Sequence, residues 1–493
     1  EFFSITILSL LITSLIYYLF SDHSKTQKGL PPGPKPWPIV GNLLQLGDKP
    51  HSQFYEMAKT YGDLFTLKMG TQTVVVASTP AAATEILKTH DRLLSARYVF
   101  QSFRIPKHVE NSMVWSDCTD AWNMLRKICR TEIFTTKMIE AQAYVRESKV
   151  LEMVKFIKGK QGSEVKVLKV VFETLVNVFG NLIFSQDVFQ MGDPSGEGAV
   201  MKGHIWRMLE LGNSTNPADY FPILGRFDLF GHRKDVEECL RQIYDVWGVM
   251  LKERKAKKAA IQEKGGNYNN SDFVDVLLDS GLEDFQMNIL LMELFGSGTE
   301  TSSSTIEWAM AELTKSPDIA AKLREELSSV VGQRPVKEAD IPNLPYLQAI
   351  TKETLRLHPS TPLCIPRRAP ETCQVMNHTI PKDCQIIVNV WAIGRDPKAW
   401  EDACKFSPER FLNSSIDFKG NDFELIPFSA GRRICPGMPI AIQFVNLFVA
   451  TLVQNFEWDL PNGMDPRDLV MDDKFGLTLQ KEPPLYIVPK SRV

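Results

Sequence analysis

The chain lacks the cysteine patterns that mark a disulfide framework or a zinc site. Its eight cysteines are scattered over 493 residues, with no Cys-x-x-Cys pair and no zinc-like Cys/His spacing. It also lacks an excess of either charge, because 56 Lys and Arg residues nearly balance 59 Asp and Glu residues. We therefore expect free thiols in a reducing compartment, and no binding of nucleic acid.

Long hydrophobic runs are scarce. The first twenty residues, Glu1 to Phe20, carry one charged side chain and can cross a bilayer core of about 30 Å as a helix. Lys25, Lys28 and Lys35 follow, and positive charge favours the cytosolic side. A cleaved signal peptide is the alternative, but Phe20-Ser21-Asp22 offers no small-x-small cleavage site. A single-pass transmembrane anchor over 1–20, with the rest facing the cytosol, is the prediction.

Prolines are concentrated directly after this run. The stretch from Leu30 to Pro38 cannot be helical, because prolines this dense remove amide donors and fix an extended backbone. It predicts a stiff linker over 21–38, followed by one folded domain over 39–493. A ligand for an SH3-like partner is the alternative for the same prolines.

The domain is expected to be mainly α with small β-sheets. Apolar, β-branched residues at Leu64–Leu67 and Thr73–Val76 predict two strands, after which helical periodicity extends to about Leu357. Short strands are predicted again at Cys384–Val390 and Leu485–Val488.

One cysteine stands in a distinctive loop. The segment from Phe428 to Gly437 precedes a long apolar pattern, so Cys435 is expected at the start of a helix. Free amides and the helix dipole stabilise a thiolate there, and the glycines allow close approach to a flat ligand. Arg433 is placed to meet a carboxylate on such a ligand. A buried structural cysteine is the alternative.

The spacing Phe-x-x-Gly-x-Arg-x-Cys-x-Gly in this loop resembles the haem-binding loop of the cytochrome P-450 superfamily. Further family marks appear in order over about residues 30 to 490. The resemblance implies the cytochrome P-450 fold and a haem b cofactor (iron protoporphyrin IX). Cys435 would be the iron ligand, and Phe428 would belong to the haem-binding loop.

A second mark lies between Gly296 and Ser302, where small and hydroxyl residues interrupt a helical pattern. A threonine there can compete for backbone carbonyls and open the helix, which would make room for dioxygen. The resemblance assigns proton delivery to Glu300 and Thr301. A helix kink without a catalytic role is the alternative.

Other marks concern buried charge. Trp122 and Arg126 match the family's Trp-x-x-x-Arg pair at a haem propionate, and Arg367 is similar to a further propionate contact, as is Arg433. Glu353 and Arg356, with Pro408–Phe411 downstream, resemble a buried Glu-Arg-Arg network.

The implied activity is that of a haem-thiolate monooxygenase that uses dioxygen and electrons from NADPH. No nucleotide-binding glycine fingerprint follows an expected strand, so a membrane-bound NADPH-cytochrome reductase is the implied partner. Lys127, Arg130 and Arg432 are candidates for its docking face. The endoplasmic reticulum membrane is the implied location.

The segments Leu43–Pro50, His108–Trp115 and Asn213–Phe221 resemble the plant branch that makes benzylisoquinoline alkaloids. This implies a small-molecule alkaloid substrate and 3'-hydroxylation of N-methylcoclaurine. Oxidative phenol coupling or another alkaloid oxidation is the alternative. An alternative of a different class, a haem-binding sensor or electron carrier, would not need Glu300 and Thr301.

Substrate contacts are expected in four variable segments. These would fall at 98–115, 205–215, 290–297 and 360–365. A basic alkaloid favours a nearby carboxylate, for which Glu210 is a candidate, although a solvated helix residue is the alternative.

Overall fold

The computed structural model describes residues 6, 9, 12–13, 29–188, 190–192, 203–205, 207–208, 210–212, 214, 216–266 and 272–492. Nearly all of the predicted anchor over 1–20, and the linker residues 21–28, lie outside the described residues. Residues 30–36 have no regular secondary structure, and Trp37 forms an isolated bridge with Gly41, as dense prolines require.

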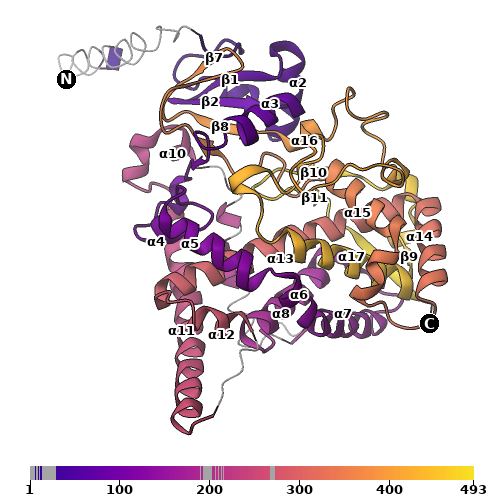
Figure 1. Cartoon of the computed structure of the whole chain (residues 1–493). Coiled ribbons are helices and arrows are strands. Elements are labelled where there is room, and N and C mark those ends of the chain that lie inside the picture. Colours follow the sequence, from indigo (N-terminus) through magenta and orange to yellow (C-terminus); the bar gives the residue numbers. More distant parts are fainter. Residues whose placement is uncertain are drawn as a thin grey trace.

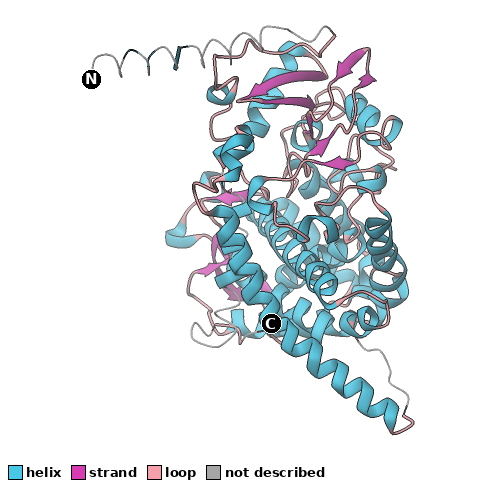
Figure 2. Ribbon diagram, turned by 90° about the vertical axis from the view of Figure 1, so that its left-hand side faces the viewer, coloured by secondary structure: helices cyan, strands magenta, loops and turns pink. Residues whose placement is uncertain are grey.

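The domain is mainly helical (Figure 2), as expected from the sequence. Its helices are α2 (Pro50–Tyr61), α3 (Pro80–Thr84), α4 (His108–Asn111), α5 (Asp120–Ile128), α6 (Thr136–Ala141), α7 (Ala143–Lys158), α8 (Val167–Phe184), α10 (Pro217–Tyr220), α11 (His232–Glu263), α12 (Phe273–Leu278), α13 (Asp284–Lys315), α14 (Pro317–Val330), α15 (Pro345–Leu357), α16 (Val390–Ile393) and α17 (Met438–Asn455). Short 3-10 and π turns join them, among them η2 (Glu85–Thr89) and η8 (Gly431–Arg433).

The strands form small sheets. They are β1 (Leu64–Met69), β2 (Gln72–Ala77), β3 (Ala96–Arg97), β4 (Val165–Lys166), β5 (Arg367–Arg368), β6 (Cys373–Val375), β7 (His378–Ile380), β8 (Gln385–Val388), β9 (Phe456–Asp459), β10 (Asp472–Lys474), β11 (Gln480–Glu482) and β12 (Tyr486–Ser491). The largest sheet has the order β1-β2-β8-β5-β3, with β2 and β8 parallel and the other neighbours antiparallel. It lies at the end of the molecule where the chain begins (Figure 1).

The predicted strands β1, β2, β8 and β12 are confirmed, and the pairs that join distant segments were not foreseen. Strands β3 and β5 have two residues each, too few to produce an alternating pattern. They matter to the site, because Arg97 in β3 lies opposite Arg367 in β5.

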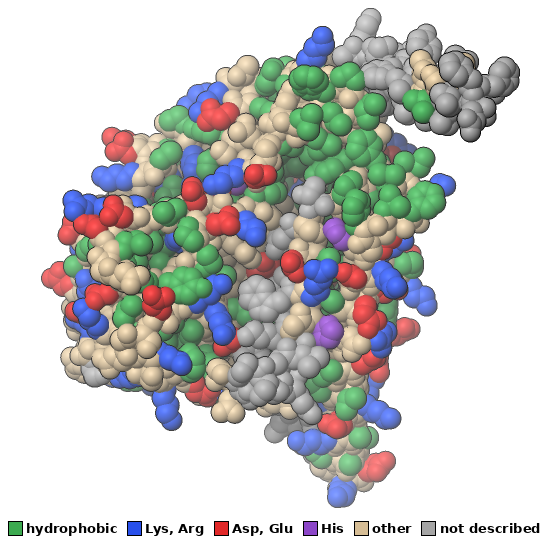
Figure 3. All heavy atoms as spheres, turned by 180° about the vertical axis from the view of Figure 1, so that it is seen from behind, with side chains coloured by type: hydrophobic (Ala, Val, Ile, Leu, Met, Phe, Trp, Pro, Cys, Tyr) green, Lys and Arg blue, Asp and Glu red, His purple; other side chains and the backbone are tan. Residues whose placement is uncertain are grey.

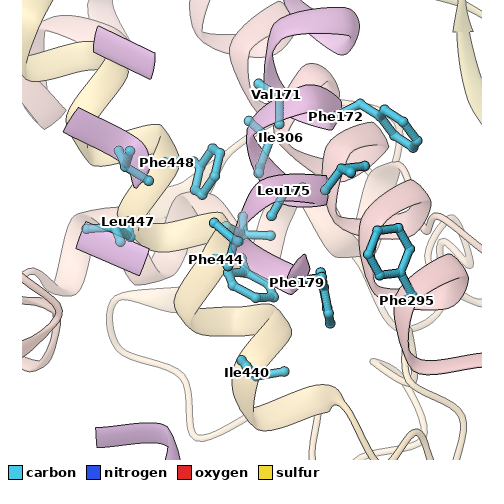
Figure 4. Close-up of a cluster of buried hydrophobic side chains, with 14 of the residues drawn as sticks. Val171, Phe172, Leu175, Phe179, Phe295, Ile306, Ile440, Phe444, Leu447 and Phe448 are labelled. Atoms are coloured by element: carbon cyan, nitrogen blue, oxygen red, sulfur yellow. The ribbon is translucent and has the colours of Figure 1, made fainter. Parts of the chain in front are cut away.

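The core is built on two apolar helices, α8 and α17. Both are long and apolar enough to cross a membrane, but 89% of the apolar stretch of α8 and 61% of that of α17 is buried within the protein. A helix that is apolar on all sides belongs in a core. In Figure 4, Phe179 of α8 lies between Phe444 of α17 and Phe295 of α13, with ring centroids 5.5 and 6.1 Å away.

Helix α13 lies against both core helices and spans 32 residues. It begins with a capping box, in which Glu283 and Gln286 satisfy each other's free amides. Gly298 permits its close contact with α8, since a Cβ at this position would lie 2.1 Å from the Phe179 ring. The predicted opening of the helix is wrong, because α13 is continuous through Gly296–Ser302.

The predicted Glu-Arg-Arg network is present between α15 and the turn at Pro408–Phe411. Arg356 Nε and Nη2 donate to the Glu353 carboxylate, at 2.6 and 2.8 Å. Arg410 Nε donates to the same carboxylate at 3.0 Å. The side chains of Glu353 and Arg356 are fully buried, so their charges are compensated by each other, by Arg410 and by nearby backbone groups.

We expect Arg356→Leu to lower the free energy of unfolding by about 3–5 kcal/mol, because it strands a buried carboxylate. Chemical denaturation of the purified protein measures this change. The control is Arg241→Leu, which breaks an exposed pair with Glu238 on α11 and should leave the denaturation midpoint unchanged. Equal midpoints for the two variants would contradict the prediction.

Candidate functional site

Cys435 lies in a closed loop directly before α17. The Cys435 N–H donates to the Phe428 carbonyl at 3.0 Å, which closes the loop. The Phe428 ring is half-buried and packs edge-on against Phe418, at 5.7 Å between centroids. The structure therefore places Cys435 just before the start of a helix, as predicted.

Gly431 of this loop also permits a contact that was not predicted. Gly431 has φ +69°, and a Cβ there would lie 2.2 Å from the Leu87 carbonyl oxygen and 2.7 Å from Asp91 Oδ1. It thus permits close contact between the loop and η2, within the protein itself. Asp91 also accepts a bond from the Arg432 amide, at 3.1 Å, and so fixes the loop from outside.

The thiol of Cys435 is half-buried. Burial raises its pKa, whereas bonds from the amides of Gly437 and Met438 and the charge of Arg126 act in the opposite direction. Those amides belong to the helix start. Because burial favours the neutral thiol, a cation bound at the sulfur would favour the thiolate.

Arg433 is buried and points toward the segment before α5. Its guanidinium donates to the carbonyls of Ser95, Met113 and Ser116, at 2.9, 3.4 and 2.5 Å. It also lies 4.6 Å from the centre of the Trp122 ring. Trp122 in turn donates its indole N–H to the Met113 carbonyl at 3.0 Å.

Four guanidiniums meet around this point. Burial lowers the pKa of Arg126, of Arg367 and of Arg433, the last to about 10. Arg97, which sequence analysis missed, has its pKa lowered well below the usual value by burial and by the charges of Arg433 and Arg367. Arg126 lies 5.6 Å from the Trp122 ring.

Only Arg367 among these four has a carboxylate partner within the described part of the chain, Asp91 at 3.2 Å. Arg367 also donates to the Ala430 carbonyl of the cysteine loop at 3.2 Å. Arg97 is held by the carbonyls of Val114 and Ile365, at 3.0 and 2.7 Å.

These residues fit haem b. Three of the four guanidiniums have no carboxylate partner among the described residues, so an anionic group would stabilise them further, and haem carries two propionates. Cys435 supplies a thiol whose surface is not fully covered, and a thiolate is a haem-iron ligand. The donor set and the charge therefore match the cofactor that the family resemblance implies.

One face of α13 carries accessible polar groups on an otherwise buried stretch. Ser297 is exposed, while Glu293 and Thr301, one turn before and after it, are half-buried. Residues four apart in a helix share a face, so these three side chains line one surface. Thr301 Oγ1 donates to the Ser297 carbonyl at 2.6 Å, which is the predicted competition for a backbone acceptor.

Glu300 lies on a different face and is buried. It accepts a bond from Gln480 Nε2 at 3.3 Å, so β11 fixes its position. Sequence analysis missed Gln480, because nothing in its local pattern distinguishes it from a surface strand residue.

The segments predicted to contact substrate meet in space. A Cβ at Gly212 would lie 3.3 Å from the Phe103 ring and 4.0 Å from Leu477. The Leu479 amide donates to the Ser360 carbonyl at 2.8 Å. Segment 205–215 thus lies against both segment 98–115 and Leu477, and Leu479 binds segment 360–365. The contribution of Leu477–Leu479 was not predicted.

Two carboxylates near these segments differ in placement. Glu210 is 69% exposed and pairs with Arg207 at 2.9 Å, as a solvated helix residue does. Glu293 instead accepts bonds from the Ser112 hydroxyl and from the amides of Met113 and Val114, the last two at 2.8 and 3.3 Å. Burial raises its pKa to about 7, against the effect of these bonds. A single charge in the apolar run Ile289–Phe295 was the signal that could have identified it.

Comparison with known proteins gives consistent matches along the chain. The cytochrome P-450 family model matches residues 31–488. The chain is 69% identical over 487 residues to (S)-N-methylcoclaurine 3'-hydroxylase isozyme 1 of Papaver somniferum, which covers 99% of this chain and 100% of the relative. It is 68% identical to isozyme 2 of Eschscholzia californica over 493 residues, with both chains fully covered. Corytuberine synthase of Coptis japonica is 48% identical over 492 residues, 99% of each chain.

We expect Arg97→Leu to speed the loss of haem by about 10-fold or more, because it removes a buried donor to an anion. Transfer of haem to excess apomyoglobin measures the rate. Arg368→Leu is the control: this neighbour of Arg367 pairs with Asp117 and Asp383 and should retain haem normally. Unchanged transfer from Arg97→Leu would show that the cluster does not hold the cofactor.

Proposed function

The chain belongs to the cytochrome P-450 family, and we propose that this haem-dependent monooxygenase hydroxylates the 3' carbon of N-methylcoclaurine in benzylisoquinoline alkaloid biosynthesis. One observation carries the substrate assignment. Identity is 69% to an (S)-N-methylcoclaurine 3'-hydroxylase, against 48% to corytuberine synthase, each over 99% of this chain.

In this proposal Cys435 ligates the haem iron through its thiolate. Arg97, Arg126, Arg433 and Trp122 hold the propionate edge, with Arg367 supporting the cysteine loop, and Phe428 closes that loop through its carbonyl. When bound, thiolate-ligated haem activates dioxygen for insertion of one oxygen atom into the substrate. The protein orients the substrate, excludes water and supplies protons.

Glu300 and Thr301 are proposed to deliver protons. Thr301 Oγ1 is half-buried on the accessible face of α13, and its bond to the Ser297 carbonyl fixes the hydroxyl. Glu300 adjoins Thr301 in the chain, and its buried carboxyl is positioned by Gln480. In this proposal the Glu300 carboxyl is the proton source and the Thr301 hydroxyl relays the proton in general acid catalysis.

Electrons are proposed to come from a membrane-bound NADPH-cytochrome reductase. Lys127, Arg130 and Arg432 are exposed, and the first two lie beyond the Trp122 turn of α5. Exposed basic residues near the cysteine loop suit an acidic partner, since complementary charge steers association.

Membrane association is proposed at the end of the domain that carries the large sheet. Large hydrophobic side chains are exposed on two segments, namely Trp37, Ile39 and Leu44, and Ile223, Phe227, Leu229 and Phe230. The turn between β1 and β2 joins these segments, because Gly70 N–H donates to Val40 O and Thr71 N–H to Tyr220 O. Figure 3 shows hydrophobic side chains gathered at the upper end of one face. Such a surface suits a protein anchored by 1–20 in the endoplasmic reticulum membrane, with its catalytic domain in the cytosol.

Product analysis tests the proposed reaction. The enzyme, reductase and NADPH are incubated with N-methylcoclaurine, and we expect a product heavier by one oxygen atom, as detected by mass spectrometry. Fragmentation that places the added oxygen on the benzyl ring supports 3'-hydroxylation. Loss of two hydrogens or formation of a dimer would overturn it in favour of phenol coupling.

For Thr301→Ala we expect product formation to fall by about 100-fold, because a positioned proton donor typically contributes 10²–10⁴ to the rate. Oxidation of NADPH should fall less, so that less product forms per NADPH consumed. The control is Thr314→Ala, which removes a similar bond to a backbone carbonyl near the end of α13. An unchanged ratio of product to NADPH in Thr301→Ala would contradict the assigned role.

A further inference from the structure

Glu293 is a carboxylate built into the accessible face of α13. Its Oε1 accepts bonds from Ser112 Oγ and from the Val114 amide, and its Oε2 accepts one from the Met113 amide. A carboxylate offers about four acceptor positions. Three are used, so Oε2 retains one for a ligand.

No lysine, arginine or histidine forms an ion pair with Glu293 in the part of the chain that the structure describes. The charge of Arg433 favours the ionised form of Glu293, but its guanidinium donates to the carbonyls of Ser95, Met113 and Ser116. A partly buried carboxylate without a counter-charge is costly, and a cationic ligand would compensate it.

The position of Glu293 relates it to the chemistry. It lies eight residues before Thr301 on the same helix face, which at 1.5 Å per residue separates the two Cα atoms by about 12 Å. In N-methylcoclaurine the ring nitrogen and the 3' carbon are separated by only a few bonds. A substrate that pairs its nitrogen with Glu293 would therefore direct its benzyl ring along this face of α13 toward Thr301.

Aromatic side chains adjoin the peptides that Glu293 holds. Trp115 follows the Ser112–Val114 segment and stacks on Phe103, with ring centroids 5.0 Å apart and planes at 21°. Phe100 packs edge-on against Trp115 at 5.9 Å. Phe100 and Phe103 are half-buried, so part of each ring is accessible. Aromatic rings beside a carboxylate suit an organic ammonium ion that carries aromatic rings of its own.

We infer that Glu293 is the residue that selects cationic amine substrates, by pairing its carboxylate with the protonated ring nitrogen of the alkaloid. This inference rests on the proposed function, because it assumes that the substrate is a basic alkaloid. The pair would form at the boundary of α13 and the Ser112–Val114 segment. A carboxylate that only fixed this segment would not distinguish charged from neutral ligands.

The test compares two ligands of matched shape. N-methylcoclaurine carries a basic nitrogen, whereas the nitrogen of N-acetylcoclaurine is a neutral amide. Equilibrium dialysis of the full-length, haem-loaded protein gives the dissociation constant of each ligand, and their ratio measures the preference for the cation.

In Glu293→Gln we expect the preference for the amine to fall by about 10-fold or more, because a charged hydrogen bond is replaced by a neutral one. Binding of the neutral ligand should change little. Glu293→Asp keeps the charge and should retain most of the preference. The matched control is Glu210→Gln, an exposed carboxylate that should leave the ratio as in the wild type.

Equal weakening of both ligands in Glu293→Gln, or an unchanged ratio, would overturn the inference and leave Glu293 with a structural role. An altered ratio in Glu210→Gln but not in Glu293→Gln would overturn it in favour of the exposed carboxylate. Turnover by the wild type is read separately. If the wild type does not hydroxylate N-methylcoclaurine, the proposed function fails. The ratios of the dissociation constants still decide whether Glu293 favours the cationic ligand over the neutral one.

Discussion

Buried positive charge around the cysteine loop is the constraint on which the rest of the site depends. Arg97, Arg126, Arg367 and Arg433 arrive from different parts of the chain, and burial lowers the pKa of each. Like charges in a poorly polarisable interior are stable only when an anion or oriented carbonyls surround them. The short pairing of β3 with β5 places Arg97 and Arg367 opposite each other, so the five-stranded sheet helps to build the arginine cluster that we propose holds the cofactor.

Helix α13 binds the same short segment as the arginine cluster, because Glu293 and Arg433 both bind Met113. Its buried faces pack against α8 and α17, and Gly298 allows the first of these contacts. The remaining face is left with Glu293, Ser297 and Thr301, a carboxylate and two hydroxyls. A rigid, fully packed helix thus holds polar groups at fixed heights along one line, which is the precision that a reaction on a chosen carbon requires.

The sequence was sufficient where a motif is local. Three pairs of residues are close in sequence, so their spacing places each pair on one loop or one helix face: Cys435 with Arg433, Trp122 with Arg126, and Glu353 with Arg356. The burial of Glu353 and Arg356 and the haem roles of the other two pairs were implied only by the family resemblance. Strands β1, β2, β8 and β12 had readable apolar patterns.

The sequence was insufficient where a contact joins segments that are far apart in the chain. Arg97 and Gln480 are ordinary residues in their own segments, and each gains a role through a partner far away in the sequence, Ile365 and Glu300 respectively. The opening of α13 was predicted from hydroxyl residues, but their bonds to carbonyls are accommodated within a regular helix.

The short segment Ser112–Ser116 is held from both sides. Glu293 binds amides of the segment, while Arg433 and Trp122 bind the Met113 carbonyl. Both backbone groups of Met113 are therefore hydrogen-bonded. Its amide binds Glu293 on α13, and its carbonyl binds Arg433 of the arginine cluster and Trp122. A sequence change that reshapes this segment disturbs both partners together. The described contacts of Gly212 and Leu477 do not include the arginine cluster, so a substitution at either position is expected to reshape the predicted substrate segments without disturbing that cluster.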